Sequence, residues 1–268
     1  MTQKEKLNFL LDYLIKESAG DLAIRIPFET AAQKQLLRSL LNVRPPKPAT
    51  EEFLKIQDEY LKQEIREKGI TDANHLIPVR DRLCIWQGDI TTLICGAIVN
   101  AANSAMLGCF VPCHGCIDNA IHTYAGVQLR AECSRLMKEQ GHEEPTGRAK
   151  ITGAYNLPCD YIIHTVGPVI CGRLTEKDCD LLKSCYVACL KTAEEHNIKS
   201  IAFCCISTGE FHFPNETAAK IAVDTVTDYL KTSKLERVVF NVFQDRDKEI
   251  YTKLLGAYQP PERKNGNC

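Results

Sequence analysis

Residues 97–118 read AIVNAANSAMLGCFVPCHGCID, and the fold can be deduced outward from this stretch. Its first four residues, Ala97 to Asn100, have the length and apolar character of a buried strand. The polar segment that follows contains two glycines and a proline, so it cannot be a regular helix or strand throughout. A helical pattern begins at Ile117. The order of strand, long irregular loop and helix is typical of an α/β protein.

The same alternation continues through the rest of the chain after Asn74. Short β-rich apolar runs predict strands at residues 82–86, 97–100, 161–166, 200–206 and 237–242. Longer helical patterns predict helices at residues 117–137, 176–196, 214–230 and 247–255. We therefore expect a sheet with helices on both faces. Ligands of such sheets bind beyond the carboxyl ends of the strands, where the loops 88–91, 101–116 and 207–214 fall.

The N-terminal part of the chain has a different pattern. Apolar residues recur at helical spacing within residues 7–15, 31–41 and 53–61. Short helices need a surface on which to bury their apolar stripes, so residues 1–74 are predicted to form a helical extension docked on the remainder. We expect the α/β domain to span residues 75–260 and residues 261–268 to form a flexible tail.

Composition excludes several classes of function. The 33 basic and 34 acidic residues leave a formal net charge of -1, which favours neither nucleic acid nor an anionic membrane. The N-terminal 20 residues are charged and their apolar residues are interrupted, so they predict no signal peptide or membrane span. We therefore expect the protein to be cytoplasmic. That compartment keeps thiols reduced, so the 14 cysteines are expected to be buried or to bind metal.

Three potential metal ligands, Cys109, His114 and Cys116, lie within eight residues of one another. Two sulfurs and an imidazole fill three corners of a zinc tetrahedron, and an open fourth corner is typical of a catalytic site. Cys113 is a rival ligand that spacing alone does not exclude. The alternative is that these cysteines are small core residues, as most of the others in apolar runs are predicted to be. Spacing favours one Zn²⁺ per chain.

Two further loops have residues suited to a nucleotide. In residues 207–211, a strand passes to a helix through hydroxyls and a glycine, so backbone N–H groups can converge on phosphate. Asp89 can accept from a purine amine, although by itself the residue is better explained as the cap of a helix that begins at Ile90. Asn103 can hold a ribose hydroxyl, and the alternative is a turn closed by its own side chain.

Several ordered motifs give the chain after Asn74 a family resemblance. They are QGDIT (87–91), AIVNAANSAMLG (97–108), IDNAIHTYAG (117–126), ITGAYNLPCDYIIHTVGP (151–168), CISTGEFHFP (205–214) and VVFNVFQDRDKEIY (238–251). Together they resemble the macrodomain, an ADP-ribose-binding module with a three-layer mixed sheet. The segment CFVPCHGC (109–116), in place of the usual glycine-rich loop, resembles the zinc-dependent macrodomain hydrolases, which also carry an N-terminal helical extension.

The resemblance implies roles for individual residues. Asp89 would bind the adenine amine and Ile90 would make a nearby backbone contact. Asn103 would hold the distal ribose, with Asp118 beside it, and these two residues would be catalytic. Asp118 alternatively caps the helix before Ile121. The full ADP-ribose-binding set would be Asp89, Ile90, Asn103, Ile117, Asp118, Ser207, Thr208, Gly209, Glu210 and Phe211.

The function implied by these residues is zinc-dependent removal of mono-ADP-ribose from modified protein side chains. Zinc would activate water or polarise an oxygen of the substrate. One alternative is a reader module that binds ADP-ribose and uses zinc structurally; another is an O-acetyl-ADP-ribose deacetylase. The implied partner is an ADP-ribosylated protein, with a lipoyl-carrier protein as a candidate. His122 and His164 lie near the motifs but are predicted to be structural.

Overall fold

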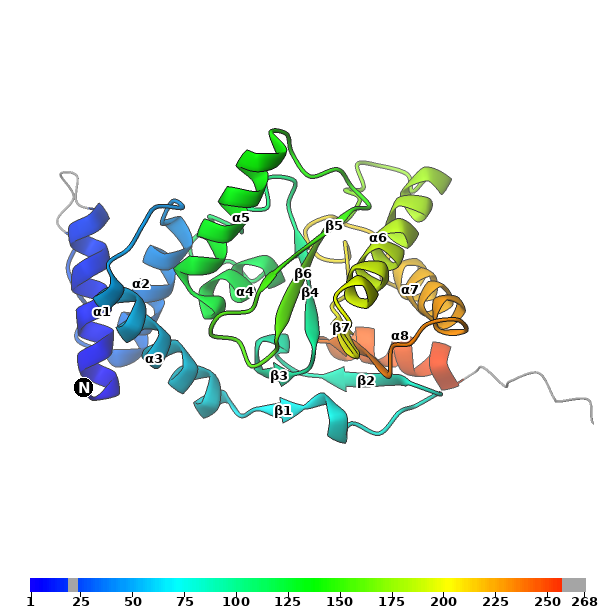
Figure 1. The fold of residues 1–268 in the computed structure, drawn as a ribbon, viewed down its shortest axis with the longest axis horizontal. Coiled ribbons are helices and arrows are strands. Elements are labelled where there is room, and N and C mark those ends of the chain that lie inside the picture. The colour runs from blue at the N-terminus through cyan, green and yellow to red at the C-terminus, as the bar shows by residue number, and fades with distance from the viewer. Residues whose placement is uncertain (19–23, 257–268) are drawn as a thin grey trace, which may run out of the picture.

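The computed structural model describes residues 1–18 and 24–256, and Figure 1 shows its layers. The predicted tail, residues 261–268, lies outside the described residues, as does the end of the predicted 75–260 domain. Six strands form the central sheet in the order β2-β8-β7-β4-β6-β5. Neighbouring strands are parallel except β5, which is antiparallel to β6. The strands are β2 (Leu83–Gln87), β4 (Ala97–Ala102), β5 (Ala149–Gly153), β6 (Tyr161–Val166), β7 (Ser200–Phe203) and β8 (Arg237–Val242).

Helices cover both faces of this sheet. Figure 1 shows α4 (Ile117–Ala125) and α5 (Val127–Gln140) on one side, and α6 (Glu176–Glu195), α7 (Asn215–Leu230) and α8 (Asp245–Gly256) on the other. The predicted three-layer fold with a mixed sheet is confirmed. A separate two-residue parallel pair joins β1 (Thr71–Asp72) to β3 (Leu93–Ile94), and single 3₁₀ turns occupy η1 (Ala73–His75) and η2 (Ile90–Thr92). No helix in the described ranges is long and apolar enough to cross a membrane.

The predicted helix 117–137 is wrong as a single element. Gly126, with φ +94°, separates α4 from α5 and changes the chain direction. A side chain there would collide with Gln57 and Asn156, whose amide nitrogens would lie 2.6 and 2.9 Å from a Cβ. The apolar pattern continued across the break, so it carried no sign of the turn. Strand β5 was not predicted, because its residues are mostly half-buried and follow a long polar loop.

Three N-terminal helices precede the sheet, as the sequence predicted: α1 (Gln3–Ser18), α2 (Thr30–Val43) and α3 (Glu51–Lys68). Their leucines and Phe53 form an apolar cluster separate from the core around the sheet. The contact with α4 and α5 combines apolar and polar groups. Tyr124 and Val127 pack against the N-terminal cluster, and Arg130 donates from Nη1 to the carbonyls of Leu41 and Asn42 at 3.1 and 2.9 Å, and also to that of Arg44. These carbonyls at the end of α2 lack partners within the helix, so one buried guanidinium satisfies them.

Candidate active site

The three predicted ligand-binding loops follow the carboxyl ends of parallel strands, so they lie on the same side of the sheet. Residues 103–116 follow β4, residues 204–213 follow β7 and residues 88–92 follow β2. A contact between side chains joins the first two loops: His114 Nε2 lies 3.5 Å from Glu210 Oε1. The predicted metal loop and the predicted phosphate loop are therefore neighbours in space, although almost 100 residues separate them.

The side chains of Cys109, His114 and Cys116 converge at one point. Their sulfur and nitrogen atoms all lie within 4.8 Å of one another, and each residue is half-buried. The Cys109 Sγ and His114 Nδ1 atoms are 3.6 Å apart. Zn–S and Zn–N bonds of about 2.3 and 2.0 Å at a tetrahedral angle place such atoms about 3.5 Å apart. The separation of Cys109 and His114 therefore matches that of two ligands on one zinc ion, and Cys116 lies within reach of the same point.

The rival ligand, Cys113, points elsewhere. Its thiol is exposed and lies 3.2 Å from Ser39 Oγ and 3.4 Å from the carbonyl oxygen of Gln35. The residue has φ +53°, in the left-handed region. In the described part of the chain, the group able to share one ion here comprises the trio and not Cys113.

Asp118 lies on the first turn of α4, directly after the loop that carries the trio. The residue is 4% exposed, and its carboxylate accepts hydrogen bonds from Asn100 Nδ2 at 2.8 Å and from Asn103 Nδ2 at 3.3 Å. Burial raises the pKa of Asp118 to about 6, against the hydrogen bond from Asn100 and the charge of Arg130. The alternative role as a helix cap is wrong, because Cys116 is the N-cap residue and its sulfur accepts from Asn119.

The carboxamide of Asn103 is held on both sides. Its Nδ2 also donates to the carbonyl of Gly108 at 3.1 Å, and its Oδ1 accepts from the backbone N–H of Ala105 at 3.1 Å. The side chain thus closes a local turn, as the structural alternative predicted, while remaining half-buried beside Asp118. Closing the turn fixes the amide at the edge of the site.

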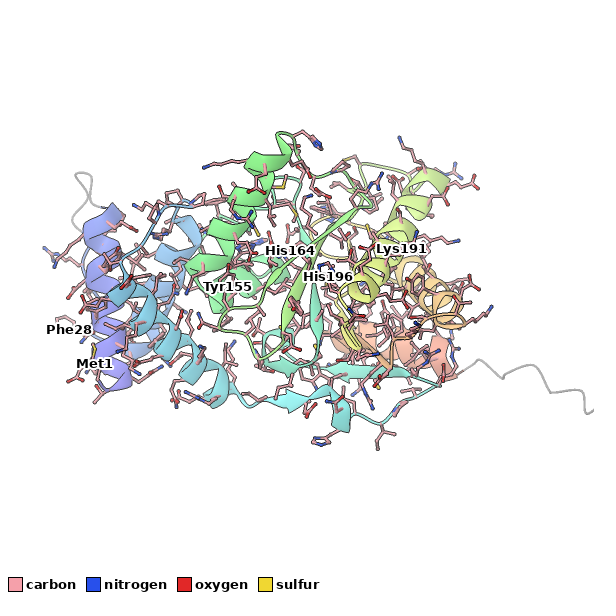
Figure 2. The ribbon with its side chains drawn as sticks, viewed as in Figure 1. Met1, Phe28, Tyr155, His164, Lys191 and His196 are labelled. Atoms are coloured by element: carbon pink, nitrogen blue, oxygen red, sulfur yellow. The ribbon has the colours of Figure 1, made fainter. Side chains whose placement is uncertain are left out.

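Two buried histidines lie behind Asp118. His164, on β6 and labelled in Figure 2, places Nδ1 3.1 Å from Asn100 Nδ2 and Nε2 2.9 Å from Thr152 Oγ1. Since the amide of Asn100 donates, Nδ1 accepts and the proton lies on Nε2. Burial lowers the pKa of His164 to about 3, so the ring is neutral. Neither ring nitrogen of His122 has a hydrogen-bond partner among the residues described.

The predicted phosphate loop turns sharply at Ser207. This residue has φ +65° and is 5% exposed, and within the described ranges its Oγ has no hydrogen-bond partner. The turn is closed by bonds from Phe213 N to Ser207 O and from His212 N to Gly209 O, at 2.9 and 3.0 Å. No backbone bond to another described residue uses the N–H groups of residues 209–211. Such a turn offers several N–H donors to an anion.

Gly167 faces this loop from the end of β6. A Cβ at this position would lie 2.0 Å from Ser207 Oγ, so only glycine allows the two loops to approach. Phe211, whose carbonyl accepts from Ile170 N at 2.9 Å, is half-buried at the rim of the same loop. Phe243 is 76% exposed beyond the end of β8.

The predicted adenine contact, Asp89, is already engaged. Its Oδ1 accepts from the N–H and hydroxyl of Thr91 at 3.0 and 2.6 Å, so it caps η2 as the alternative predicted. Its Oδ2 pairs with Lys68 Nζ at 2.8 Å. Burial favours the neutral carboxyl, but the bonds from Lys68 and Thr91 outweigh it and lower the pKa of Asp89. Ile90 is 2% exposed, and Ile117 is half-buried at the start of α4.

Lys68 is a residue of this region that the sequence did not reveal. It lies at the C-terminal end of α3, with Nζ 3.3 Å from the centre of the Tyr124 ring as well as paired with Asp89. The N-terminal helices therefore reach the predicted adenine end of the site. Lys68 and Asp89 are 21 positions apart and no local sequence pattern links them, so their pairing is visible only in the fold.

Comparison with protein families and relatives gives a consistent result. The Macro domain family model matches residues 99–222. A Treponema medium protein named protein-ADP-ribose hydrolase is 56% identical over 260 residues, which cover 95% of this chain and 100% of the relative. A Staphylococcus aureus (strain MSSA476) protein of the same name is 47% identical, over 93% of this chain and 95% of the relative.

Solved structures show the same fold. The Oceanobacillus iheyensis macrodomain with ADP has a TM-score of 0.62 and 36% identity, covering 68% of this chain and 94% of that one. The Trypanosoma brucei macrodomain in complex with ADP-ribose has a TM-score of 0.63 and 29% identity, covering 82% and 95%. From the sheet, the loops at its edge and these relatives, we conclude that the chain belongs to the macrodomain family, in the group of protein-ADP-ribose hydrolases.

Proposed function

We propose that the protein is a zinc-dependent hydrolase that removes mono-ADP-ribose from modified protein side chains. The observation that carries this proposal is the contact between His114 and Glu210, at 3.5 Å. It brings the Cys/His trio next to the loop suited to a diphosphate, so a bound nucleotide would extend toward the metal ligands. The names of the relatives from Treponema medium and Staphylococcus aureus support a hydrolase of ADP-ribosylated protein.

In this proposal the phosphate loop binds the diphosphate and Asp89 binds the adenine. The free N–H groups of residues 209–211 donate to phosphate oxygens, which need several converging donors. Asp89 has one oxygen paired with Lys68 and the other with Thr91, so an adenine amine would use a remaining lone pair. Ile90 contributes its backbone, because its side chain is buried.

Asn103 and Asp118 act at the distal ribose. Asp118 holds the Asn103 carboxamide in one orientation, and that amide in turn positions a ribose hydroxyl beside the trio. The Asp118 carboxylate is also the acidic group proposed to accept a proton or to orient water. Cys109, His114 and Cys116 would hold zinc, which supplies a Lewis acid for charge that develops at the scissile bond. Ile117 would contact the nucleotide from the start of α4.

Two other functions would use the same residues. A reader module with structural zinc would be expected to close the metal with a fourth protein ligand. Among the residues described, the cluster holds three ligands, which favours a catalytic site. A deacetylase acting on free O-acetyl-ADP-ribose needs the same polarised oxygen, so substrate trials must separate it from the proposed activity.

The test is incubation of the purified protein with defined substrates. ADP-ribose linked to protein through acidic, serine or arginine side chains is compared with the free acetyl ester, and the released ADP-ribose is measured. We expect release from at least one modified protein, with loss of release in the Cys116→Ala variant and retention in Cys113→Ala. Full activity in Cys116→Ala protein that contains no metal would contradict the zinc mechanism.

The expected partner is an ADP-ribosylated protein, for which a lipoyl-carrier protein is one candidate to include among the substrates. ADP-ribose is the expected product. We also propose the cytoplasm as the compartment, because reduced thiols there keep the trio available for a metal.

A further inference from the structure

The loop that carries the proposed metal ligands is held by the N-terminal helix α2. Arg38, in the middle of this helix, donates from Nη2 to the carbonyl of His114 at 2.9 Å. The same guanidinium donates from Nε and Nη2 to Asn119 Oδ1, at 3.1 and 2.8 Å. One arginine thus contacts the backbone of a ligand residue and the side chain of Asn119, which follows the loop on α4.

Asn119 continues the connection to the other two ligand residues. Its Nδ2 donates to the carbonyls of Cys109 at 3.4 Å and Val111 at 2.9 Å. Its backbone N–H donates to Cys116 Sγ at 3.5 Å. The side chain is fully buried, so it has no water to replace these bonds. Arg38 and Asn119 together therefore touch all three residues of the trio.

A second residue of α2 fixes the turn between the ligands. Asn42 Oδ1 accepts from the backbone N–H of Cys113 at 2.9 Å, while Asn42 Nδ2 donates to Thr123 Oγ1 at 2.9 Å. Asn42 is 1% exposed. Cys113 has φ +53°, a conformation that costs energy for any residue with a side chain. The bond from Asn42 offsets this cost and holds the turn that presents His114.

We infer that Arg38 and Asn42 are positioning residues of the metal centre, and that α2 shapes the ligand loop before the metal binds. The inference rests on the proposed function for the presence of the metal. Groups that hydrogen-bond around a metal site orient its ligands, and their removal typically weakens metal binding by about 10- to 100-fold. A loop fixed in advance also loses less conformational entropy on binding. The N-terminal extension is then part of the metal centre.

The test measures Zn²⁺ affinity by competition with a chelator, using the full-length protein. We expect Arg38→Ala and Asn42→Ala to bind Zn²⁺ at least about tenfold more weakly than the wild type. Lys34→Ala is the matched control on the same helix, because Lys34 pairs with Glu64 at 2.7 Å and makes no bond to the loop. Its Zn²⁺ affinity is expected to equal that of the wild type.

Hydrogen exchange of the metal-free proteins is the second measurement. Amides of residues 109–116 are expected to exchange faster in Arg38→Ala than in the wild type, with the sheet strands unchanged. Arg38→Lys, which keeps the charge but loses the planar fork, covers the case in which Arg38→Ala does not fold, and it is expected to weaken Zn²⁺ binding too.

Wild-type Zn²⁺ affinity and wild-type loop exchange in the folded Arg38 variants would overturn the inference and leave the proposed function standing. Conversely, a wild-type protein that binds Zn²⁺ but releases no ADP-ribose from any substrate contradicts the proposed function alone. Weaker binding in the Arg38 variants would still support the role of α2. A wild-type protein that binds no Zn²⁺ overturns both.

Discussion

Asn103 donates its Nδ2 hydrogen to Oδ2 of Asp118 at 3.3 Å, while Asn100 occupies Oδ1 of the same carboxylate at 2.8 Å. Both carboxylate oxygens therefore serve amide donors. In Asp118→Asn, an N–H₂ group replaces one of these oxygens and faces an amide donor, so Asn100 or Asn103 loses its acceptor and the carboxylate proposed to accept a proton is gone. Asn103 keeps its bonds to Gly108 and Ala105. We expect kcat to fall by about 100-fold, the scale of positioning and proton-transfer effects, and ADP-ribose affinity to fall much less. Turnover assays and calorimetric titration measure the two quantities.

Asp224→Asn is the control for that substitution. Asp224 is exposed on α7 and pairs with Lys220 on the surface, so its loss is expected to leave both quantities unchanged. If Asp118→Asn weakened ADP-ribose binding strongly and left the turnover number intact, the residue would be part of a reader site instead.

Most of the sheet could be predicted because each strand has a local signature. Apolar runs such as Ala97 to Asn100 are buried on both faces, so their composition alone identifies them. Gly126 is by itself a helix-stop signal, but the apolar pattern continues past it and hides the break. The close approach of Gln57, almost 70 residues earlier, has no local signal. Strand β5 was missed because it is a half-buried edge strand, and its pattern is correspondingly weak.

The candidate site also contains residues that the sequence can predict and residues that only the fold brings together. The trio could be proposed from sequence because its residues lie on one loop, where spacing itself restricts geometry. The residues that hold the loop could not, because Arg38 and Asn119 are 81 positions apart and meet only in the fold. Helix capping was also ambiguous: an acidic residue near a helix start caps η2 at Asp89, but at α4 a cysteine takes that role.

Gly126→Ala is expected to destabilise the protein through both backbone conformation and contact. Gly126 has φ +94°, and a Cβ would lie 2.6 Å from Gln57 Nε2 at the joint between α3 and α4. Gly141→Ala is the matched control, with φ +76° and open space around the added methyl. We expect a loss of about 1 kcal/mol at Gly141 and at least about 2 kcal/mol at Gly126. Urea unfolding measures both, and equal losses would contradict a role for the collision.

Gly167→Ala is expected to disturb the phosphate loop. The new methyl would lie 2.0 Å from Ser207 Oγ, 2.9 Å from Ile206 Cγ2 and 3.3 Å from Ser207 Cβ, so rotating the hydroxyl does not relieve every contact and residues 206–207 must shift. If residues 207–211 bind the diphosphate, ADP-ribose affinity should fall at least about tenfold, the loss of one good charge-assisted hydrogen bond. Gly153→Ala, where nothing lies within 4 Å of the added methyl, is the control. Unchanged affinity in a folded Gly167→Ala protein would place the diphosphate elsewhere.

The stability of the fold should depend on pH through His164. Burial lowers its folded pKa to about 3, whereas the unfolded chain takes up a proton near 6.5. The contribution of neutral, buried His164 to the unfolding free energy is therefore complete above pH 6.5 and is lost as the pH falls toward 3. Between pH 6.5 and pH 3, His164 should reduce the unfolding free energy by about 1.4 kcal/mol for each unit by which the pH falls. We expect a smaller slope in His164→Gln, whose side chain does not titrate, measured by urea unfolding between pH 7 and pH 4.5.

The groups that face His164 determine how this slope is isolated. His122 is buried beside it with its pKa also lowered, which adds to the slope, whereas burial raises the pKa of Asp118 to about 6, which opposes it. The wild-type slope is a sum, so the difference between wild type and His164→Gln carries the test. Cys133, whose pKa burial raises to about 12, does not titrate in this range. Cys133→Ala should therefore lower the unfolding free energy equally at every pH, and a His164→Gln protein that behaved the same way would contradict a neutral buried His164.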